Sequence, residues 1–336
     1  MKITSHHIDY LNIGLIIISL IFAFILPFQL FLFSYAILGP LHYLTELNWL
    51  DEKKYFINNK NLIWIFIVFA LLFAFPYIFK LPVFDPIAKD KYMSRILHFF
   101  ESHINGLVFL AIVMSISFVF TKRIYIRIVI IISGLVLSQI LNTNSFYNIW
   151  IGIFIPTVIH VYIFTLLFMA YGALKMRSIP GYISTALVLI IPLIIFILDI
   201  QPESYIFTDL IKQTYLATDF QVVNAKISGL LGLSDGNHFY FYEKPYLKIQ
   251  IFLAFAYTYH YLNWYSKTSV IGWYKNLTTK RTLLIGLLWV LSMGIYLYDY
   301  QTGFLILLAL SLLHVFAEFP LNVVSIQGII QEIKKT

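Results

Sequence analysis

The chain has no cysteine and few charged residues. The absence of cysteine among its 336 residues excludes disulfides, thiolate catalysis, iron–sulfur clusters and cysteine-ligated zinc. Any bound metal must therefore be held by nitrogen and oxygen atoms. Charged residues make up 12% of the chain, against about a quarter in a typical soluble domain. No basic run lies outside the short loops, which gives nucleic-acid binding no support.

Hydrophobic residues dominate instead. They account for 60% of the chain, the mean hydropathy is +0.83, and apolar runs long enough to cross a bilayer recur along the sequence. This pattern predicts an all-α polytopic transmembrane bundle that forms one integral membrane domain over residues 1–336. About ten spans are predicted, at 10–26, 28–47, 61–79, 96–120, 123–141, 149–174, 181–200, 246–265, 282–298 and 303–324.

The basic residues predict the sidedness of the bundle. If the N-terminus is cytoplasmic, most loop Lys and Arg residues fall on the inner side, as the positive-inside rule requires. Ten spans then place the C-terminus on the cytoplasmic side as well, and a bacterial inner membrane is the predicted location. The outer loop 80–95 is an exception, because it carries four basic residues. The inner-side residues are Lys53, Lys54, Lys60, Lys122, Arg123, Lys175, Arg177, Lys267, Lys275, Lys280, Arg281, Lys334 and Lys335.

One long stretch, 201–245, does not read as a span. Residues 205–233 mix apolar and polar side chains, which predicts one or two amphipathic helices lying at the membrane interface. The turn residues 234–237 and an aromatic run over 238–242 follow. This segment either roofs a cavity that is open to lipid or serves as an ordered connector.

Five histidines lie inside predicted spans, each on a different one. Imidazole is costly in hydrocarbon unless it is paired or bound to metal, so such residues are functional candidates. Histidine is also the commonest metal ligand, and we expect the bundle to bring these side chains to one centre. Estimated depths, at about 1.5 Å per residue, favour four of them and leave His103 as a fifth ligand nearer the outer surface. The four are His42, His160, His260 and His314.

Two carboxylates accompany these histidines. His42 and Glu46 are four residues apart and face the same way on a helix, as do His314 and Glu318. Each carboxylate could share a metal with its histidine, or accept the ring N–H and orient the imidazole. The alternative is a polar pair that ties helices together. Gly39-Pro40 would let the first of these helices bend just before His42.

Aromatic residues surround two of the histidines. They are dense enough to line a pocket for a long, flat, apolar substrate, although an aromatic belt at the membrane surface would look similar. The predicted substrate-lining residues are Tyr43, Tyr257, Tyr261, Asn263 and Trp264.

A centre of histidines and carboxylates without thiolate suits non-haem Fe(II), with zinc or manganese as less favoured alternatives. The substrate would be a lipid-soluble unsaturated molecule that arrives from the membrane lipids, and iron could activate dioxygen against it. The competing hypotheses are a transporter or ion-handling protein with a His/Glu relay, and a membrane lipid hydroxylase or desaturase. The dense His-x-x-His-His clusters of the latter are missing. No protein partner is predicted.

The segment Gly39-Pro40-Leu41-His42-x-x-x-Glu46 resembles the Gly-x-Pro-His-Gly-x-x-Asp motif of the bacterial Brp/Blh β-carotene 15,15′-dioxygenases. Tyr43 stands where that family has Gly, and Glu46 where it has Asp. The resemblance covers about eight residues and extends to the chain length and the scattered histidines. It implies a helical membrane fold, His42 as an iron ligand with Glu46 as its partner, and oxidative cleavage of a carotenoid to retinal.

Overall fold

The computed structural model describes residues 5–53, 61–267, 272 and 277–335, and within these ranges it contains helices and no strand. Lys54, Lys60 and Lys275, which entered the prediction of sidedness, lie outside the described residues. The helices are α1 (Ser5–Ile25), α2 (Pro27–Phe33), η1 (Ser34–Leu38), α3 (Gly39–Lys53), α4 (Asn61–Ile78), η2 (Pro82–Phe84), α5 (Asp85–Ala88), α6 (Lys91–Phe120), α7 (Ile124–Leu141), α8 (Ser145–Ile149), η3 (Trp150–Phe164), α9 (Thr165–Met176), α10 (Ile179–Ile197), η4 (Pro202–Ser204), α11 (Asp209–Leu216), α12 (Phe220–Leu230), α13 (Lys244–Ser266), α14 (Thr279–Tyr298) and α15 (Tyr300–Ile333).

These helices form an all-α polytopic bundle of the kind found in multi-pass membrane proteins. Eight helices in the described part of the chain are long and apolar enough to cross a membrane, and a ninth is added if α4 and the sharply bent α5 segment count as one span. Each of the ten predicted spans coincides with a helix or a continuous helical run. α13 is not among these eight helices, although it lies at the centre of the bundle.

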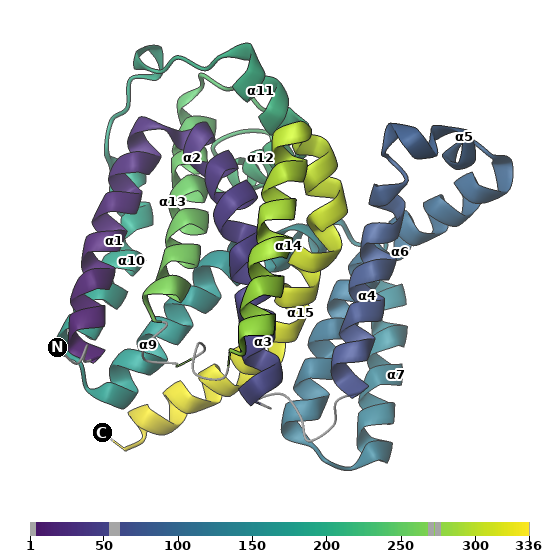
Figure 1. Ribbon diagram of the computed structural model, residues 1–336, viewed down its shortest axis with the longest axis horizontal. Coiled ribbons are helices and arrows are strands. Elements are labelled where there is room, and N and C mark those ends of the chain that lie inside the picture. The colour runs from purple at the N-terminus through teal and green to yellow at the C-terminus, as the bar shows by residue number, and fades with distance from the viewer. Residues whose placement is uncertain (1–4, 54–60, 268–271, 273–276, 336) are drawn as a thin grey trace.

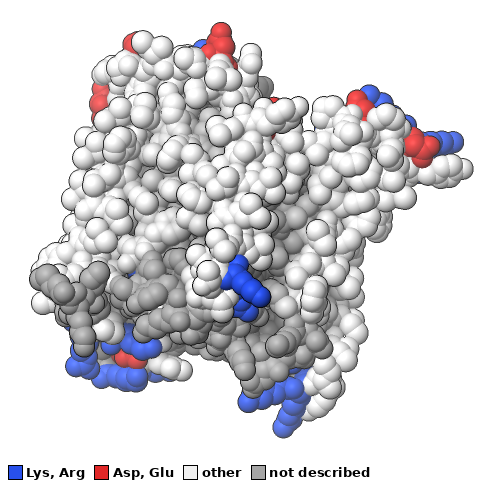
Figure 2. Space-filling view, viewed as in Figure 1, with Lys and Arg blue, Asp and Glu red and all other residues white. Residues whose placement is uncertain are grey.

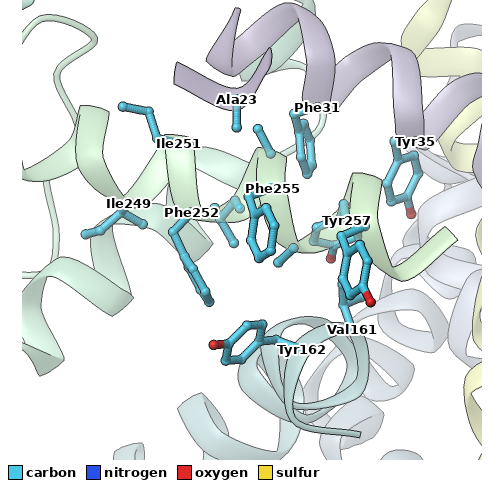
Figure 3. Close-up of a cluster of buried hydrophobic side chains, with 14 of the residues drawn as sticks. Ala23, Phe31, Tyr35, Val161, Tyr162, Ile249, Ile251, Phe252, Phe255 and Tyr257 are labelled. Carbon is cyan, nitrogen blue, oxygen red and sulfur yellow. The ribbon is translucent and has the colours of Figure 1, made fainter. Parts of the chain in front are cut away.

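α13 is enclosed by the rest of the molecule. It packs against α1, α2, α3, α10, α12 and the π-helical segments η1 and η3, as Figure 1 shows. Every residue from 249 to 261 is buried. In Figure 3, Phe252, Phe255 and Tyr257 of α13 lie among Phe31 and Tyr35 from one side and Tyr162 from the other. Protein rather than lipid therefore surrounds this helix, which lets it carry tyrosines and other polar residues.

A second group of helices lies beside this core. α6 packs against both α4 and α7, and α15 joins α4 and α6 to the main bundle. The two groups have separate apolar cores. Tyr43 and Tyr261 belong to the core around α13, whereas Leu312 and Val315 of α15 belong to the other. The boundary between the two cores therefore passes close to His314.

The segment 201–245 covers one end of the bundle (Figure 1). Its two short helices, α11 and α12, are anchored to α13 by buried hydrogen bonds. The Tyr215 hydroxyl donates to Gln250 Oε1 at 2.7 Å, and Asn224 Nδ2 donates to the carbonyl oxygen of Tyr246 at 3.0 Å. Gln250 in turn donates to the Pro27 carbonyl at 3.1 Å. The segment is thus an ordered cap on the bundle.

Exposed charged side chains gather toward the ends of the molecule on the face that Figure 2 shows. On the face shown in Figure 2, most Lys and Arg side chains gather at the lower end, where α1 begins and α15 ends. A mixed acidic and basic group lies at the α5 end, and a wide white surface separates the two. This distribution suits a protein whose middle faces lipid.

Candidate metal centre

Four histidines from four different helical segments meet inside the bundle. His42 comes from α3, His160 from η3, His260 from α13 and His314 from α15. All four are at most 6% exposed. The Nε2 atoms of His42 and His260 lie 3.1 Å apart, as do those of His160 and His314. His42, His260 and His314 each offer a ligand atom within 4.8 Å of the other two, so this buried group could hold a metal ion.

The spacing of these nitrogens is that of ligands around one ion. Two nitrogens bound at 2.0–2.1 Å, with angles between a right angle and the tetrahedral value, stand about 2.8–3.4 Å apart. Both Nε2–Nε2 distances, at 3.1 Å, fall in this interval. The ring planes of neighbouring histidines cross at 64° to 82°. Such rings direct their nitrogens toward a shared point without stacking.

Thr165 orients one of the four rings. Its hydroxyl donates to the Val161 carbonyl oxygen at 2.8 Å, so the Thr165 oxygen accepts from Nδ1 of His260 at 2.7 Å. That arrangement keeps the proton on Nδ1 and leaves the Nε2 lone pair directed at the other histidines. Thr165 was not among the residues predicted from the sequence, because a threonine in an apolar helix carries no pattern that points to a metal.

Two carboxylates adjoin the histidines. Glu46 Oε2 lies 3.0 Å from Nε2 of His42, as the four-residue spacing predicts. Glu318 differs from the prediction, because its Oε2 lies 3.0 Å from Nδ1 of His160 rather than beside His314. η3 passes alongside α15, so His160 contacts both residues, His314 through Nε2 and Glu318 through Nδ1.

The buried charge of this group favours a cation. Glu46 and Glu318 are 2% and 3% exposed. Their Oε2 atoms have no hydrogen-bond partner of good geometry among the described residues. Two ionised carboxylates with so little exposure are strongly unfavourable without a compensating positive charge. A single divalent ion among four neutral histidines would balance both.

A cavity of about 450 Å³ borders the centre on one side. We call it the aromatic cavity. It is lined by His160, His260 and His314, and by the three predicted substrate-lining tyrosines Tyr43, Tyr257 and Tyr261. The Tyr43 ring stacks on His314 with centroids 4.1 Å apart, and the Tyr43 and Tyr261 hydroxyls are 2.9 Å apart. Its walls also include apolar side chains of α4, α12 and α15.

A second cavity, of about 270 Å³, borders the opposite side of the centre. We call it the carboxylate-side cavity, because Glu46 and Glu318 line it together with His42 and Thr165. Asn263 and Trp264 also lie here. The five predicted substrate-lining residues are therefore divided between two cavities, with Tyr43, Tyr257 and Tyr261 at the aromatic cavity and Asn263 and Trp264 at this one. The division arises because Tyr257 lies a turn before His260 on α13 and Asn263 lies a turn after it.

His103 lies apart from the other four histidines. Its Nδ1 is 2.8 Å from the Phe99 carbonyl oxygen of its own helix, α6, and its ring contacts Phe99. The structure does not bring this side chain to the group of ligands. His103 lies on α6, whose buried hydrophobic residues belong to the second apolar core rather than to the core around α13.

The backbone around two of the four histidines departs from a regular α-helix. η1, just before Gly39 and His42, and η3, which contains His160, are π-helical. Such segments are frequent at functional sites, because the extra residue per turn redirects side chains. Gly39 is needed here for close packing, since a Cβ atom at this position would lie 2.9 Å from the Tyr43 hydroxyl and 3.2 Å from that of Tyr261.

Comparison with known proteins adds no further identification. No protein-family model matches the chain, and no curated protein or solved structure is significantly similar to it.

Proposed function

We propose that the protein is a membrane-embedded non-haem iron oxygenase acting on a lipid-soluble unsaturated substrate. The observation that carries the proposal is the meeting of four buried histidines with an aromatic cavity on one side and two carboxylates on the other. An aromatic pocket of a few hundred Å³ suits an apolar ligand. Both termini would be cytoplasmic and the membrane a bacterial inner membrane.

Iron is the metal that the proposed reaction with dioxygen requires. Imidazole and carboxylate without thiolate suit Fe(II), and also zinc or manganese; iron would supply the activation of dioxygen. The four histidines would hold the ion, with Thr165 fixing the tautomer of His260. Glu46 and Glu318 would balance its charge and orient His42 and His160.

A carotenoid-like polyene is the substrate class we favour. Tyr43, Tyr257 and Tyr261 would lie against its flat chain, beside His260 and His314. In the proposed reaction one carbon–carbon double bond breaks and each oxygen atom of dioxygen ends in one of two new carbonyl groups. The two carbons lose the four electrons that dioxygen gains, so no external reductant is needed. The motif around His42 resembles that of β-carotene dioxygenases, which supports this choice.

Metal content provides the first test. We expect protein purified in detergent to contain about one iron per chain, and the double variant His42→Ala, His260→Ala to contain none. His103→Ala is the matched control, because it removes an intramembrane histidine that lies away from the group, and it should retain the metal. Folded wild-type protein that binds no metal after incubation with Fe(II) would refute the proposal.

Activity provides the second test. Expression in a carotenoid-producing host should bleach the cells and yield aldehyde products, and the double variant should leave the colour unchanged. Labelled dioxygen should place one labelled atom in each product. Products that retain the full carbon skeleton would point instead to a hydroxylase or desaturase.

An ion-handling protein is the second candidate. It is favoured by one observation: cavities reach the same histidines from two sides, and His260 lines both of them. In liposomes containing the purified protein, sustained uptake of Fe(II) or Zn(II) would support this function. Stoichiometric binding without uptake would support the oxygenase.

A further inference from the structure

The carboxylate-side cavity has features that an apolar substrate does not require. It extends from the metal centre toward the end of the bundle where α1 begins and α13 ends, and its walls include Asp9 and Asn12 of α1, Lys175 of α9, and Ser325 of α15. Asp9 and Asn12 lie near the start of α1, Lys175 near the end of α9, and Ser325 in the last third of α15. The aromatic cavity opens elsewhere, between α4, α12 and α15.

Three buried oxygen atoms belong to residues at the inner part of this cavity. Glu46 Oε2 and Glu318 Oε2 each lie 3.0 Å from one histidine nitrogen, and a carboxylate oxygen can accept more than one hydrogen bond. Asn263 Oδ1 has no hydrogen-bond partner among the described residues. All three residues border the cavity. Buried polar atoms of this kind are normally satisfied by water or an ion. Carboxylate and amide oxygens are also the groups that replace water around a hard divalent cation.

The lysines at the outer end of the carboxylate-side cavity do not prevent a cation from entering it. Asp9 is the acidic group that acts on Lys267, so these two charges partly cancel. Lys175 is exposed, and its Nζ lies 5.5 Å from the centre of the Tyr171 ring. The two carboxylates at the inner end supply the attraction that draws a cation inward.

We infer that the carboxylate-side cavity is the aqueous inlet through which a hydrated divalent cation reaches the four histidines. The aromatic cavity then serves the lipid-soluble substrate alone, so metal and substrate approach the centre from opposite sides. The inference rests on the metal binding in the proposed function. It adds a role for Asn263 and for the polar end of α1, which the proposed chemistry does not use.

Because the chain has no cysteine, one introduced thiol can both probe and block the inlet. Ser325 is 1% exposed, lines the cavity and lies two helical turns beyond Glu318 on α15. Ser325→Cys should react with a charged, water-soluble methanethiosulfonate. The attached group should then slow Fe(II) uptake by metal-free protein about tenfold or more, measured by competition with a chromogenic chelator.

Two cysteine controls locate the effect. Thr218 lines the aromatic cavity, and modification of Thr218→Cys should leave the uptake rate unchanged. Ser117 is fully buried and does not line either cavity, so Ser117→Cys should not react.

A pair of glycine variants tests the same route without a reagent. Gly172 borders the cavity on α9, and a Cβ atom there would meet no other atom within 4 Å. A leucine at this position can therefore fill space at the wall without disturbing the helix. Gly172→Leu should slow Fe(II) uptake about tenfold. Gly286→Leu is the matched control, because its Cβ is equally unobstructed and it lies on α14, away from both cavities.

The outcomes separate the inference from the proposed function. Slow uptake with unchanged final iron content in modified Ser325→Cys and in Gly172→Leu supports the inlet. An unreactive Ser325→Cys, or modified protein that loads as fast as wild type, overturns the inlet while leaving the metal centre intact. Wild-type protein that binds no iron at all refutes the proposed function and the inlet with it.

Discussion

Thr165 shows how a single hydroxyl can decide the chemistry of a buried imidazole. His260 is 6% exposed, and the Thr165 hydroxyl is the hydrogen-bond partner of its Nδ1. The Thr165 hydroxyl oxygen lies 2.7 Å from Nδ1 of His260 and accepts its hydrogen bond, which keeps the proton on Nδ1. Nε2 of His260 then faces His42 without a proton. Outer partners of this kind typically change metal affinity by about 10- to 100-fold when they are removed.

Thr165→Val should weaken Fe(II) binding by about 10- to 100-fold, because His260 is then free to place its proton on Nε2. Chelator competition on purified protein measures this affinity. Thr185→Val is the control, since the Thr185 hydroxyl makes the same kind of bond to its own helix, at the Gly181 carbonyl. Equal affinities for the two variants would contradict the role given to Thr165.

Glu46→Gln should reduce the stabilisation that Fe(II) confers on the protein. The variant removes one of two buried negative charges that the ion balances, so the metal-bound form loses more stability than the metal-free form. The measurement is the difference in Tm with and without Fe(II), in detergent. A difference as large as that of wild type would show that the carboxylate does not act on the ion.

Part of this site could be predicted from single residues. Intramembrane histidines without cysteine pointed to a metal centre, and the estimated depths marked His103 as the outlier; the structure brings the other four together. That these residues bind iron stays a prediction. Thr165 and the pairing of Glu318 with His160 could not be predicted, because both depend on which helices lie side by side.

At the scale of the helix, two π-helical segments set the directions of His42 and His160. The sequence predicted a bend at Gly39-Pro40, but the chain continues there from η1 into α3 with helical angles at Gly39. A π-helical turn has no simple sequence pattern, since it arises where packing favours one extra residue per turn. The exact facing of side chains on these two segments was therefore beyond prediction.

Gly39→Ala should destabilise the protein by about 1–3 kcal/mol, the usual cost of overpacking a core. The added methyl group would displace the hydroxyls of Tyr43 and Tyr261, which are hydrogen-bonded to each other. Unfolding in detergent measures the change. Gly286→Ala, at an open position on a helix, should leave stability equal or raise it by up to about 1 kcal/mol; a similar loss in both variants would refute the packing argument.

At the scale of the whole molecule, the bundle has two chemically different approaches to one centre. This plan was not visible in the sequence, where Tyr257, Tyr261, Asn263 and Trp264 read as one aromatic stretch. In the structure His260 lies between the two pairs of residues. Tyr257 and Tyr261 line the aromatic cavity, and Asn263 and Trp264 line the carboxylate-side cavity.

Reporter fusions test the predicted sidedness. Ten spans would leave both termini in the cytoplasm, so a reporter that is active only there should work at either end of the chain. Activity at one end alone would mean an odd number of crossings. It would single out α4 with its bent continuation, or α13, as a helix that does not span.

The enclosure of α13 also bears on how the protein is made. Its tyrosines and its buried Gln250 and Asn263 leave it outside the set of helices apolar enough to enter lipid unaided. A nascent segment of this composition partitions poorly from the translocon into the bilayer. We expect α13 to insert stably only when α1, α2 and α10, against which it packs, are already in place. Assembly of the histidine centre would then coincide with the moment at which α13 leaves the translocon, late in synthesis.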